Sequence, residues 1–225
     1  MASASASPFL SGGFEPIRDE IDRESLGIEG ELPTDLAGTF YRIGPNPQFA
    51  PREPYNPLNG DGMVHAFQVR GGRVSYRNRW VRTKKWKLER ASGRALFGTS
   101  GPPTDRDPSV MGAAINGSAN TNLVFHAGRL LALEEGFGPI EIDPVTLETR
   151  GDWTFGGRLP RNMTAHPKVD PVTGEMLFIA NFQDFRAGDL LGFHVVDAAG
   201  ELVRSAEIKA PYPALVHDSR SPRTS

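Results

Sequence analysis

The chain has 225 residues, of which 38% are hydrophobic and 23% charged, the proportions of an ordinary globular protein with a substantial core. A net charge of −2 and a pI near 6.2 exclude a basic face for nucleic acid. The complete absence of cysteine excludes disulfides, thiolate metal sites and a cysteine nucleophile, so a metal site must use histidine, carboxylate or carbonyl ligands.

The first segment, residues 1–13, is rich in serine, alanine and glycine. It predicts a flexible N-terminus, because it offers no apolar pattern that could pack. It also lacks the basic start and apolar centre of a secretion signal, and the chain has no run of roughly 20 apolar residues that could span a membrane. We therefore expect a cytoplasmic protein.

Residues 14–47 are broken by proline and glycine and predict irregular structure that ends in a turn at Gly44–Pro47. A β-hairpin is predicted next, because two strand-like runs, 64–69 and 73–81, flank the glycine pair Gly71–Gly72. Residues 84–98 are the one helix-like stretch of the sequence.

The rest of the chain repeats a strand, turn, strand pattern. The fragment Asp-Pro-Val-Thr occurs twice, at 143–146 and 170–173, and proline after aspartate favours a tight turn. Short strands in antiparallel pairs without intervening helices indicate an all-β fold, as a sandwich, barrel or propeller. The predicted units are residues 121–135, 139–153, 167–182 and 191–208.

Five histidines are the candidate metal ligands: His65, His126, His166, His194 and His217. His126 at a hairpin corner is expected to be structural, and His194 in an alternating run is expected to face solvent. His166 and His217 differ, because each ends a strand-like run and is followed by a residue that can fix its direction, proline or aspartate. Neutral imidazole suits iron, copper and zinc, but two histidines far apart also fit a structural role.

Five stretches in order resemble the carotenoid cleavage oxygenase family. They are LAGTFYRIGPNP (36–47), residues 59–83, which begin with NGDGMVHAF, residues 119–151, which contain LLALEEG, TAHPKVDPVTGEMLFIANF (164–182) and LVHD (215–218). The resemblance implies a seven-bladed β-propeller, of which residues 14–218 would form an incomplete N-terminal part of about three blades. It also implies a dioxygenase that uses Fe²⁺ and O₂ to cleave a C=C bond of a carotenoid or apocarotenoid to carbonyl products.

The resemblance assigns roles to particular residues. His166 matches the first of four histidine ligands of the iron, and His217 matches the second. Glu135 matches an outer-shell glutamate that is hydrogen-bonded to a ligand histidine, where such a carboxylate fixes the imidazole. His65 lies in a family motif without being a ligand and is expected to be structural. From its own surroundings in the sequence, without the resemblance, Glu135 is expected to be a solvent-exposed hairpin acid.

The resemblance also implies that the third and fourth ligand histidines lie outside this sequence. We therefore expect the chain by itself to be inactive and prone to aggregate. Residues 219–225, SRSPRTS, depart from the family pattern, and we hypothesise a one-nucleotide frameshift after Asp218. The gene read downstream in all frames tests this, because one frame should contain two further histidine motifs.

The expected substrate is an apolar polyene. A stilbenoid-cleaving enzyme of the family is expected to hold a phenol with a tyrosine and a lysine, but Trp86 stands where the tyrosine belongs and no lysine lies between Lys87 and Lys168. Two alternatives stay open: a stilbenoid-cleaving dioxygenase, and a non-catalytic propeller-type binding or structural protein. Peripheral membrane contact for substrate uptake is a further expectation, with the apolar segment 8–14 as a candidate.

Overall fold

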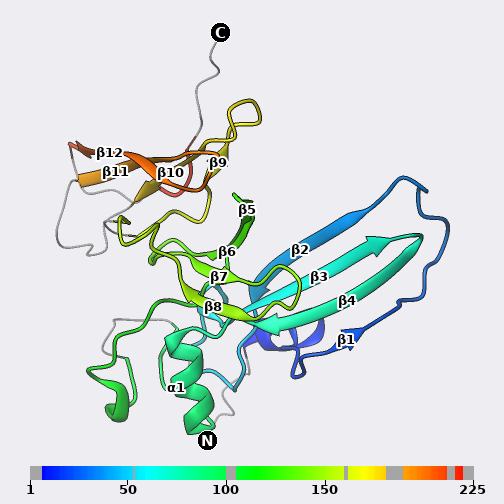
Figure 1. Cartoon of the computed structure of the whole chain (residues 1–225). Coiled ribbons are helices and arrows are strands. Elements are labelled where there is room, and N and C mark those ends of the chain that lie inside the picture. The colour runs from blue at the N-terminus through cyan, green and yellow to red at the C-terminus, as the bar shows by residue number, and fades with distance from the viewer. Residues whose placement is uncertain are drawn as a thin grey trace, which may run out of the picture. The chain divides into compact units, whose positions relative to one another are not determined.

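Most of the structured residues lie in β-strands. The structure is a computed structural model that describes residues 7–52, 54–99, 105–159, 162–180, 190–211 and 216–219. The chain divides into two units, Met1–Asn120 and Thr121–Ser225 (Figure 1). The described residues form three four-stranded antiparallel sheets, four short 3₁₀ turns and the single helix α1 (Lys84–Ser92), so the all-β prediction is confirmed. None of the described helices has the length and apolar character needed to cross a bilayer.

The N-terminal segment begins with two of the 3₁₀ turns, Pro8–Leu10 and Gly12–Phe14. Residues 1–6 of the expected flexible segment lie outside the described residues, as do residues 220–225 of the divergent tail.

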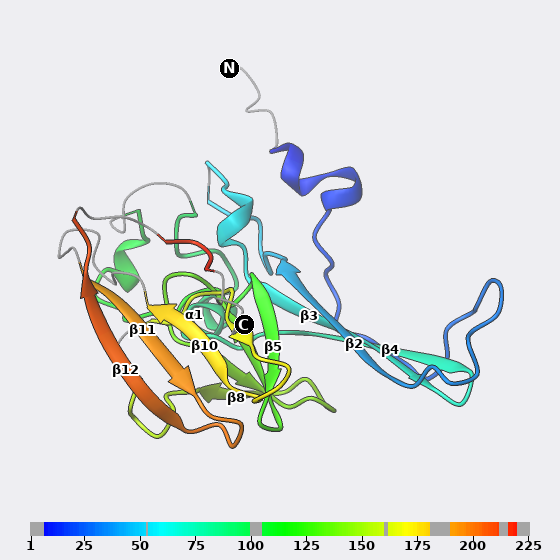
Figure 2. The same ribbon diagram turned by 90° about the horizontal axis from the view of Figure 1, so that it is seen from above.

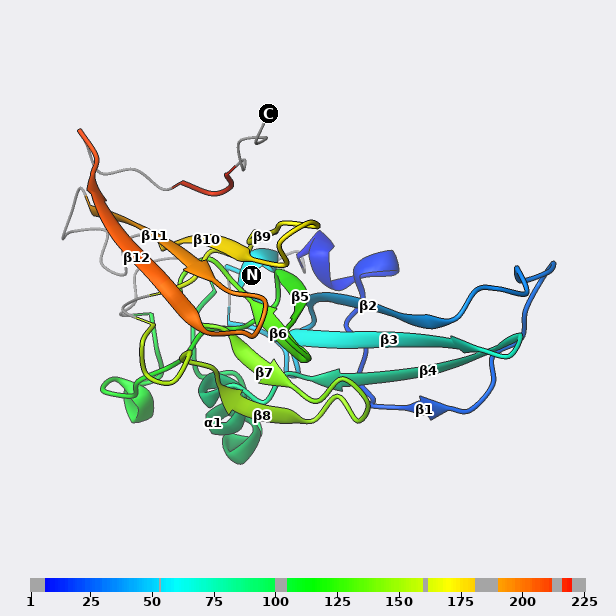
Figure 3. The ribbon, with the colours of Figure 1, turned by 45° about the horizontal axis from the view of Figure 1, so that its top comes forward.

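The first unit contains one sheet, with the strand order β1-β4-β3-β2 (Figure 3). Strands β3 and β4 form the predicted hairpin, in register from Met63↔Trp80 to Arg70↔Arg73. Both turn residues, Gly71 and Gly72, have positive φ of 57° and 70°, which explains the glycine pair. The strands are β1 (Asp22–Arg23), β2 (Gly38–Pro45), β3 (Gly62–Arg70) and β4 (Arg73–Trp80).

The expectation of irregular structure up to residue 47 is wrong for strand β2. Residues 39–43, Thr-Phe-Tyr-Arg-Ile, are good strand formers, and β3 supplies their hydrogen-bonding partners along the whole strand. Gly44 and Pro45 therefore end a strand and do not form a turn. Asn46 follows and is buried, and its amide both accepts from the Ile17 N–H at 2.7 Å and donates to the Ile17 carbonyl at 2.8 Å. The motif thus anchors the N-terminal segment.

Helix α1 confirms the helix-like stretch, although it is shorter than the fifteen residues of that stretch. The Thr83 hydroxyl accepts from the Trp86 N–H at 3.1 Å and caps the N-terminus, and Gly93 with φ 70° ends the helix. One face of the helix is buried and carries the ion pair of Lys85 with Glu89.

Gly62, in the NGDG motif, has no room for a side chain. A Cβ atom at this position would lie 2.1 Å from the Ala119 carbonyl oxygen, and the Gly62 N–H donates to the Ser118 carbonyl at 2.9 Å. We expect Gly62→Ala to lower the free energy of unfolding of the first unit by about 1–3 kcal/mol, because the backbone at Ala119 must move to make room for the methyl group. Urea unfolding measures this, with Gly44→Ala as the control, since a Cβ there meets nothing within 4 Å. Equal unfolding midpoints for the two variants would refute the close contact.

The second unit contains two sheets. One has the order β5-β6-β7-β8 and the other the order β12-β11-β10-β9, in which β10, β11 and β12 run side by side (Figure 2). All four strand, turn, strand units predicted for this region are confirmed. The strands are β5 (Asn122–His126), β6 (Arg129–Leu133), β7 (Ile140–Ile142), β8 (Thr149–Asp152), β9 (Lys168–Val169), β10 (Met176–Ala180), β11 (Leu190–Val196) and β12 (Leu202–Lys209).

Both Asp-Pro-Val-Thr fragments form the predicted turns. The Asp143 carboxylate accepts from the Val145 and Thr146 N–H groups at 2.8 Å each. The Asp170 carboxylate accepts from the corresponding N–H groups at 2.7 and 3.0 Å. The backbone hydrogen bonds from Thr146 and Val145 favour the ionised form of the Asp143 carboxyl and hold its pKa at about 2. The same local chemistry therefore builds both turns.

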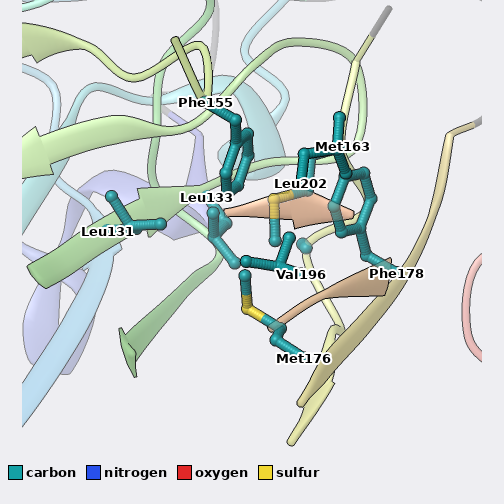
Figure 4. Packing of buried hydrophobic residues seen from close by; sticks show 9 residues of the cluster. Leu131, Leu133, Phe155, Met163, Met176, Phe178, Val196 and Leu202 are labelled. Atoms are coloured by element: carbon teal, nitrogen blue, oxygen red, sulfur yellow. The ribbon is translucent and has the colours of Figure 1, made fainter. Parts of the chain in front are cut away.

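The hydrophobic core of the second unit joins its two sheets (Figure 4). Leu131 and Leu133 of β6 face Met176 and Phe178 of β10, and the ring of Phe155 stacks on that of Phe178 with centroids 5.8 Å apart. The connection between the sheets contributes buried residues to this core as well, Met163 and Ala165 among them. This packing fixes the connection that carries His166.

The expectation that His194 faces solvent is wrong. The residue is 1% exposed, its ring stacks on Phe178 with centroids 4.8 Å apart, and its Nδ1 lies 2.9 Å from the Ser205 hydroxyl. Strand β11 lies between β10 and β12, and Val195 and Val196 on opposite faces of the strand are both buried. The alternation of apolar and other residues along β11 therefore does not identify a face of this strand that is exposed to solvent.

Acid is expected to destabilise the second unit through His194. Burial lowers the pKa of this histidine below its ordinary value, and nearby Glu207 offsets the effect only partly. The unfolded chain then takes up a proton near pH 6.5 that the folded chain takes up only at lower pH, so stability is lost as the pH falls from about 6.5. Urea midpoints measured from about pH 8 to pH 5 should fall less in His194→Phe than in the parent chain. The same pH dependence in both would contradict this.

Candidate metal centre

The segment Asn162–Ala165 is the rigid base of the candidate site. All four of its residues are fully buried at 0% exposure. The Thr164 N–H donates to the Ile179 carbonyl of β10 at 2.9 Å, and the Asn122 side chain of β5 donates to the Ala165 carbonyl at 2.8 Å. His166 comes next in the chain, and Pro167 restricts its backbone to an extended conformation. Its ring therefore projects from fixed backbone.

Glu135 lies just after β6, which ends at Leu133. The Asn162 side chain donates to the Glu135 carbonyl at 2.7 Å and holds the backbone of this loop. The Thr164 hydroxyl lies 3.3 Å from Glu135 Oε2. The carboxylate is thus held against the same buried segment that carries His166, and the idea of an exposed hairpin acid does not describe it.

His217 is held in place by a contact of its own backbone and by a contact of the next residue in the chain. Its backbone carbonyl accepts from the Thr164 hydroxyl at 3.2 Å. The next residue, Asp218, forms an ion pair with Lys168 of β9 at 2.7 Å, and this hydrogen bond is the largest cause that lowers the pKa of the Asp218 carboxyl. Two contacts therefore tie residues 217–218 to the segment around His166.

The three predicted site residues converge. The Nε2 atoms of His166 and His217 lie 3.2 Å apart, and the ring centroids lie 4.5 Å apart. Glu135 Oε1 lies 3.4 Å from the first of these nitrogens and 3.7 Å from the second. This oxygen is buried and makes no hydrogen bond to any described group. The sequence separates these residues by 31 and 51 positions, and the fold brings them to one point.

The donor atoms fit a divalent metal ion. Imidazole nitrogen together with carboxylate oxygen suits iron in its ferrous state, and a buried oxygen without a hydrogen-bond donor needs a positive partner. The side chains of Glu135 and His166 are 22% and 27% exposed and that of His217 is 64% exposed, so the group is reachable from solvent. Within the part of the chain that the structure describes, this is the one cluster of three such ligands.

The other histidines are not part of the cluster. His126 is buried, and its Nε2 lies 2.8 Å from the Gly174 carbonyl oxygen, as a structural residue would. His65 belongs to the first unit, where its Nδ1 lies 2.7 Å from the Tyr76 hydroxyl. Sequence reasoning missed Thr164, which contacts all three site residues. Its position two residues before His166 in TAHP was the available signal.

Comparisons with known proteins complete this picture. Residues 14–220 match the family model described as "Retinal pigment epithelial membrane protein". The carotenoid oxygenases belong to this family, and so does this chain. One curated relative is a lignostilbene-α,β-dioxygenase (isozyme III) from Sphingomonas paucimobilis, 42% identical over 93% of this chain and 43% of that protein.

Solved structures of carotenoid oxygenase family members share the fold. The lignostilbene dioxygenase of Pseudomonas brassicacearum superposes with a TM-score of 0.89 at 37% identity, over 97% of this chain and 46% of that one. A cobalt-substituted apocarotenoid oxygenase from Synechocystis superposes with a TM-score of 0.75 at 31% identity, over 90% and 45% of the two chains. The chain thus spans about half the length of the relatives it matches, which confirms the expectation of a partial propeller.

Thr164 is expected to be a positioning residue of the site. Thr164→Val keeps the buried shape but removes the hydroxyl that contacts Glu135 and the His217 carbonyl. We expect divalent metal affinity to fall about 10–100-fold, the range for loss of an outer-shell partner. Competition with a coloured chelator measures this, with Thr173→Val as the control because that threonine lies in an exposed turn. Unchanged affinity would refute the positioning role.

Proposed function

We propose that the complete protein is a dioxygenase that cleaves a C=C bond with O₂ and Fe²⁺, and that His166 and His217 are two of the iron ligands. The observation that carries the proposal is the approach of their Nε2 atoms to 3.2 Å beside the Glu135 carboxylate. Family membership supports it, because the relatives described above are named as oxygenases.

The residues of this chain would bind the iron and hold its ligands in position. His166 and His217 would each present a neutral Nε2 lone pair, and the Thr164 hydroxyl would hold the backbone of the 217–218 segment. Glu135 would supply negative charge beside both rings, and the family resemblance gives it an outer-shell role. Ferrous iron, when bound, supplies the redox chemistry that lets O₂ react with an alkene.

The proposed substrate is a carotenoid or apocarotenoid polyene. Trp86, where a phenol-binding tyrosine is expected, is buried at 6% exposure, and the Arg82 guanidinium lies 4.0 Å over its ring. No lysine occurs between Lys87 and Lys168. A polyene needs an apolar path and no acid–base pair. Phe9 and Phe14, 44% and 67% exposed, offer aromatic surface for contact with lipid during uptake.

The second candidate is cleavage of a hydroxylated stilbene. The specific observation in its favour is similarity, because the relative from S. paucimobilis at 42% identity and the structure from P. brassicacearum at 37% are both lignostilbene dioxygenases. The apocarotenoid oxygenase is 31% identical.

A chimera tests the proposed function. Residues 1–218 are joined to the C-terminal half of the P. brassicacearum enzyme, loaded with Fe²⁺ and given an apocarotenal or a hydroxystilbene with O₂. Consumption of O₂ with formation of two carbonyl products supports a dioxygenase, and the substrate used decides between the two candidates. An iron-loaded, folded chimera that cleaves neither substrate would favour the non-catalytic alternative.

A further inference from the structure

A cavity of about 370 Å³ lies in the first unit, between the N-terminal segment and the sheet. Phe9 and residues 13–17 line it from the N-terminal side, and residues of β2 and β3, Arg42 and His65 among them, line it from the sheet. Its volume lies within the range of small-molecule sites, and none of its lining residues belongs to the metal cluster. The cavity is therefore a candidate for a separate binding site.

The backbone around the cavity is fixed by buried contacts. The Asn46 side chain is buried and forms the two hydrogen bonds with Ile17 given above, so it ties the N-terminal segment to the sheet. Pro45 and Pro47, on either side of Asn46, restrict the backbone further. A ligand would therefore meet walls that need little ordering, which favours binding.

Aromatic side chains form the apolar wall of the cavity. The rings of Phe9 and Phe14 contact each other edge to face, with centroids 5.9 Å apart and planes at 75°. These side chains are 44% and 67% exposed, so the cavity opens to solvent beside them. Tyr55 lines the cavity as well and is buried. Ring faces and edges of this kind pack well against a further flat ring.

Arg42 places a positive charge at this cavity. The residue is exposed, and among the described residues none accepts a hydrogen bond from its guanidinium or forms an ion pair with it, Glu15 of the cavity wall included. A guanidinium presents parallel N–H donors that match the two oxygens of a carboxylate. Arg42 can therefore bind an anion that enters the cavity without first breaking an ion pair.

His65 does not add a second positive charge. The register of β2 and β3 places it directly opposite Arg42, and its Nδ1 lies 2.7 Å from the Tyr76 hydroxyl. Burial and, after it, the charge of Arg42 lower the pKa of His65 below its ordinary value, so the ring is neutral near pH 7. The described lining residues thus carry one cation, Arg42, and one anion, the exposed Glu15.

We propose that this cavity binds a small aromatic carboxylic acid, with its carboxylate on Arg42 and its ring against Phe9 and Phe14. The charged group and the apolar wall of the cavity match the two ends of such a molecule. The proposal depends neither on the metal centre nor on the proposed oxygenase activity, because the cavity lies entirely in the first unit.

Naphthalene-2-carboxylate is the probe, because its fluorescence reports binding, and naphthalene-2-carboxamide is the matched neutral compound. Each compound is titrated into the purified chain and into the chimera. We expect saturable binding of the carboxylate by both proteins, and binding of the amide that is weaker by about 10-fold or more. Arg42→Met should weaken binding of the carboxylate by about 10–100-fold, the range for a hydrogen bond to a charged group. Arg73→Met, at the turn end of β4 in the same sheet, is the matched control and should bind as the parent does.

Two further variants test the other parts of the cavity. Phe14→Ala should weaken binding of the carboxylate by about 3–10-fold through loss of a ring contact, with Phe125→Ala, exposed in the second unit, as its control. Glu15→Gln should strengthen binding by about 2–5-fold, because it removes the negative charge of the cavity wall.

Far-ultraviolet circular dichroism identifies the folded variants that are compared. The proposal is overturned if the chain binds no carboxylate, if the amide binds equally well, or if Arg42→Met binds as Arg73→Met does. Binding by the chain that is absent from the chimera overturns it as well, because the cavity would then be closed in the complete fold. All of these titrations are made without iron and O₂, so they are independent of the test of the proposed function.

Discussion

His166→Ala in the chimera is expected to reduce O₂-dependent cleavage by more than about 100-fold. The substitution removes one of the two nitrogens that face each other at 3.2 Å, and loss of a ligand should exceed the 10–100-fold loss typical of an outer-shell partner. The buried backbone of residues 162–165 should keep its conformation, because its hydrogen bonds do not involve the His166 ring. Product formation per chain, with iron content measured on the same samples, gives the effect.

His65→Gln is the matched control for this experiment. His65 is a partly buried histidine in the first unit that is hydrogen-bonded to Tyr76, and it is not one of the residues of the metal cluster. It should leave iron content and turnover near those of the parent chimera. Turnover that survives in His166→Ala would show that this histidine is not a ligand.

Lys85→Met is expected to lower the free energy of unfolding of the first unit by about 3–5 kcal/mol. The Lys85 ammonium lies 2.6 Å from Asp61 and 3.1 Å from Glu89, and the side chains of all three are nearly buried. Burial alone would lower the pKa of Lys85, but the two carboxylates outweigh it and raise the pKa above the ordinary value. Removing the ammonium group leaves two buried carboxylates without their positive partner, and an uncompensated buried charge strongly destabilises the folded state.

Glu89 makes the expected loss larger than for a simple pair. Its second oxygen accepts from the N–H groups of Leu96 and Phe97 at 2.9 and 3.1 Å, so the carboxylate cannot turn away to solvent without breaking backbone contacts. Lys87→Met on the exposed side of the same helix is the control, with an expected change below about 0.5 kcal/mol. Equal denaturation midpoints for the two variants would contradict a structural role for the buried cluster.

Local chemistry explains which parts of the fold could be predicted. The glycine pair at 71–72 and the two Asp-Pro-Val-Thr turns have their partners within a few residues, so sequence alone identifies them. Strand β2 and the burial of His194 depend on neighbouring strands that are distant in the sequence. Patterns within one segment do not contain that information.

The candidate site depended on resemblance for the same reason. His166 and His217 are 51 positions apart, and no spacing rule joins them. The resemblance supplied both residues and Glu135. It did not supply the direction of the Glu135 carboxylate, which follows from the contacts that Thr164 and Asn162 make with this loop. Thr164 stands two residues before His166, but its role follows from its contacts with Glu135 and the His217 carbonyl.

The central claim is that His166 and His217 bind the same metal ion. The X-ray absorption fine structure at the iron edge of the loaded chimera tests it directly, because each imidazole ligand gives a characteristic scattering pattern. We predict that His166→Ala and His217→Ala each remove one imidazole from the iron environment, while His65→Gln removes none. An unchanged number of imidazole ligands in either alanine variant would contradict the claim.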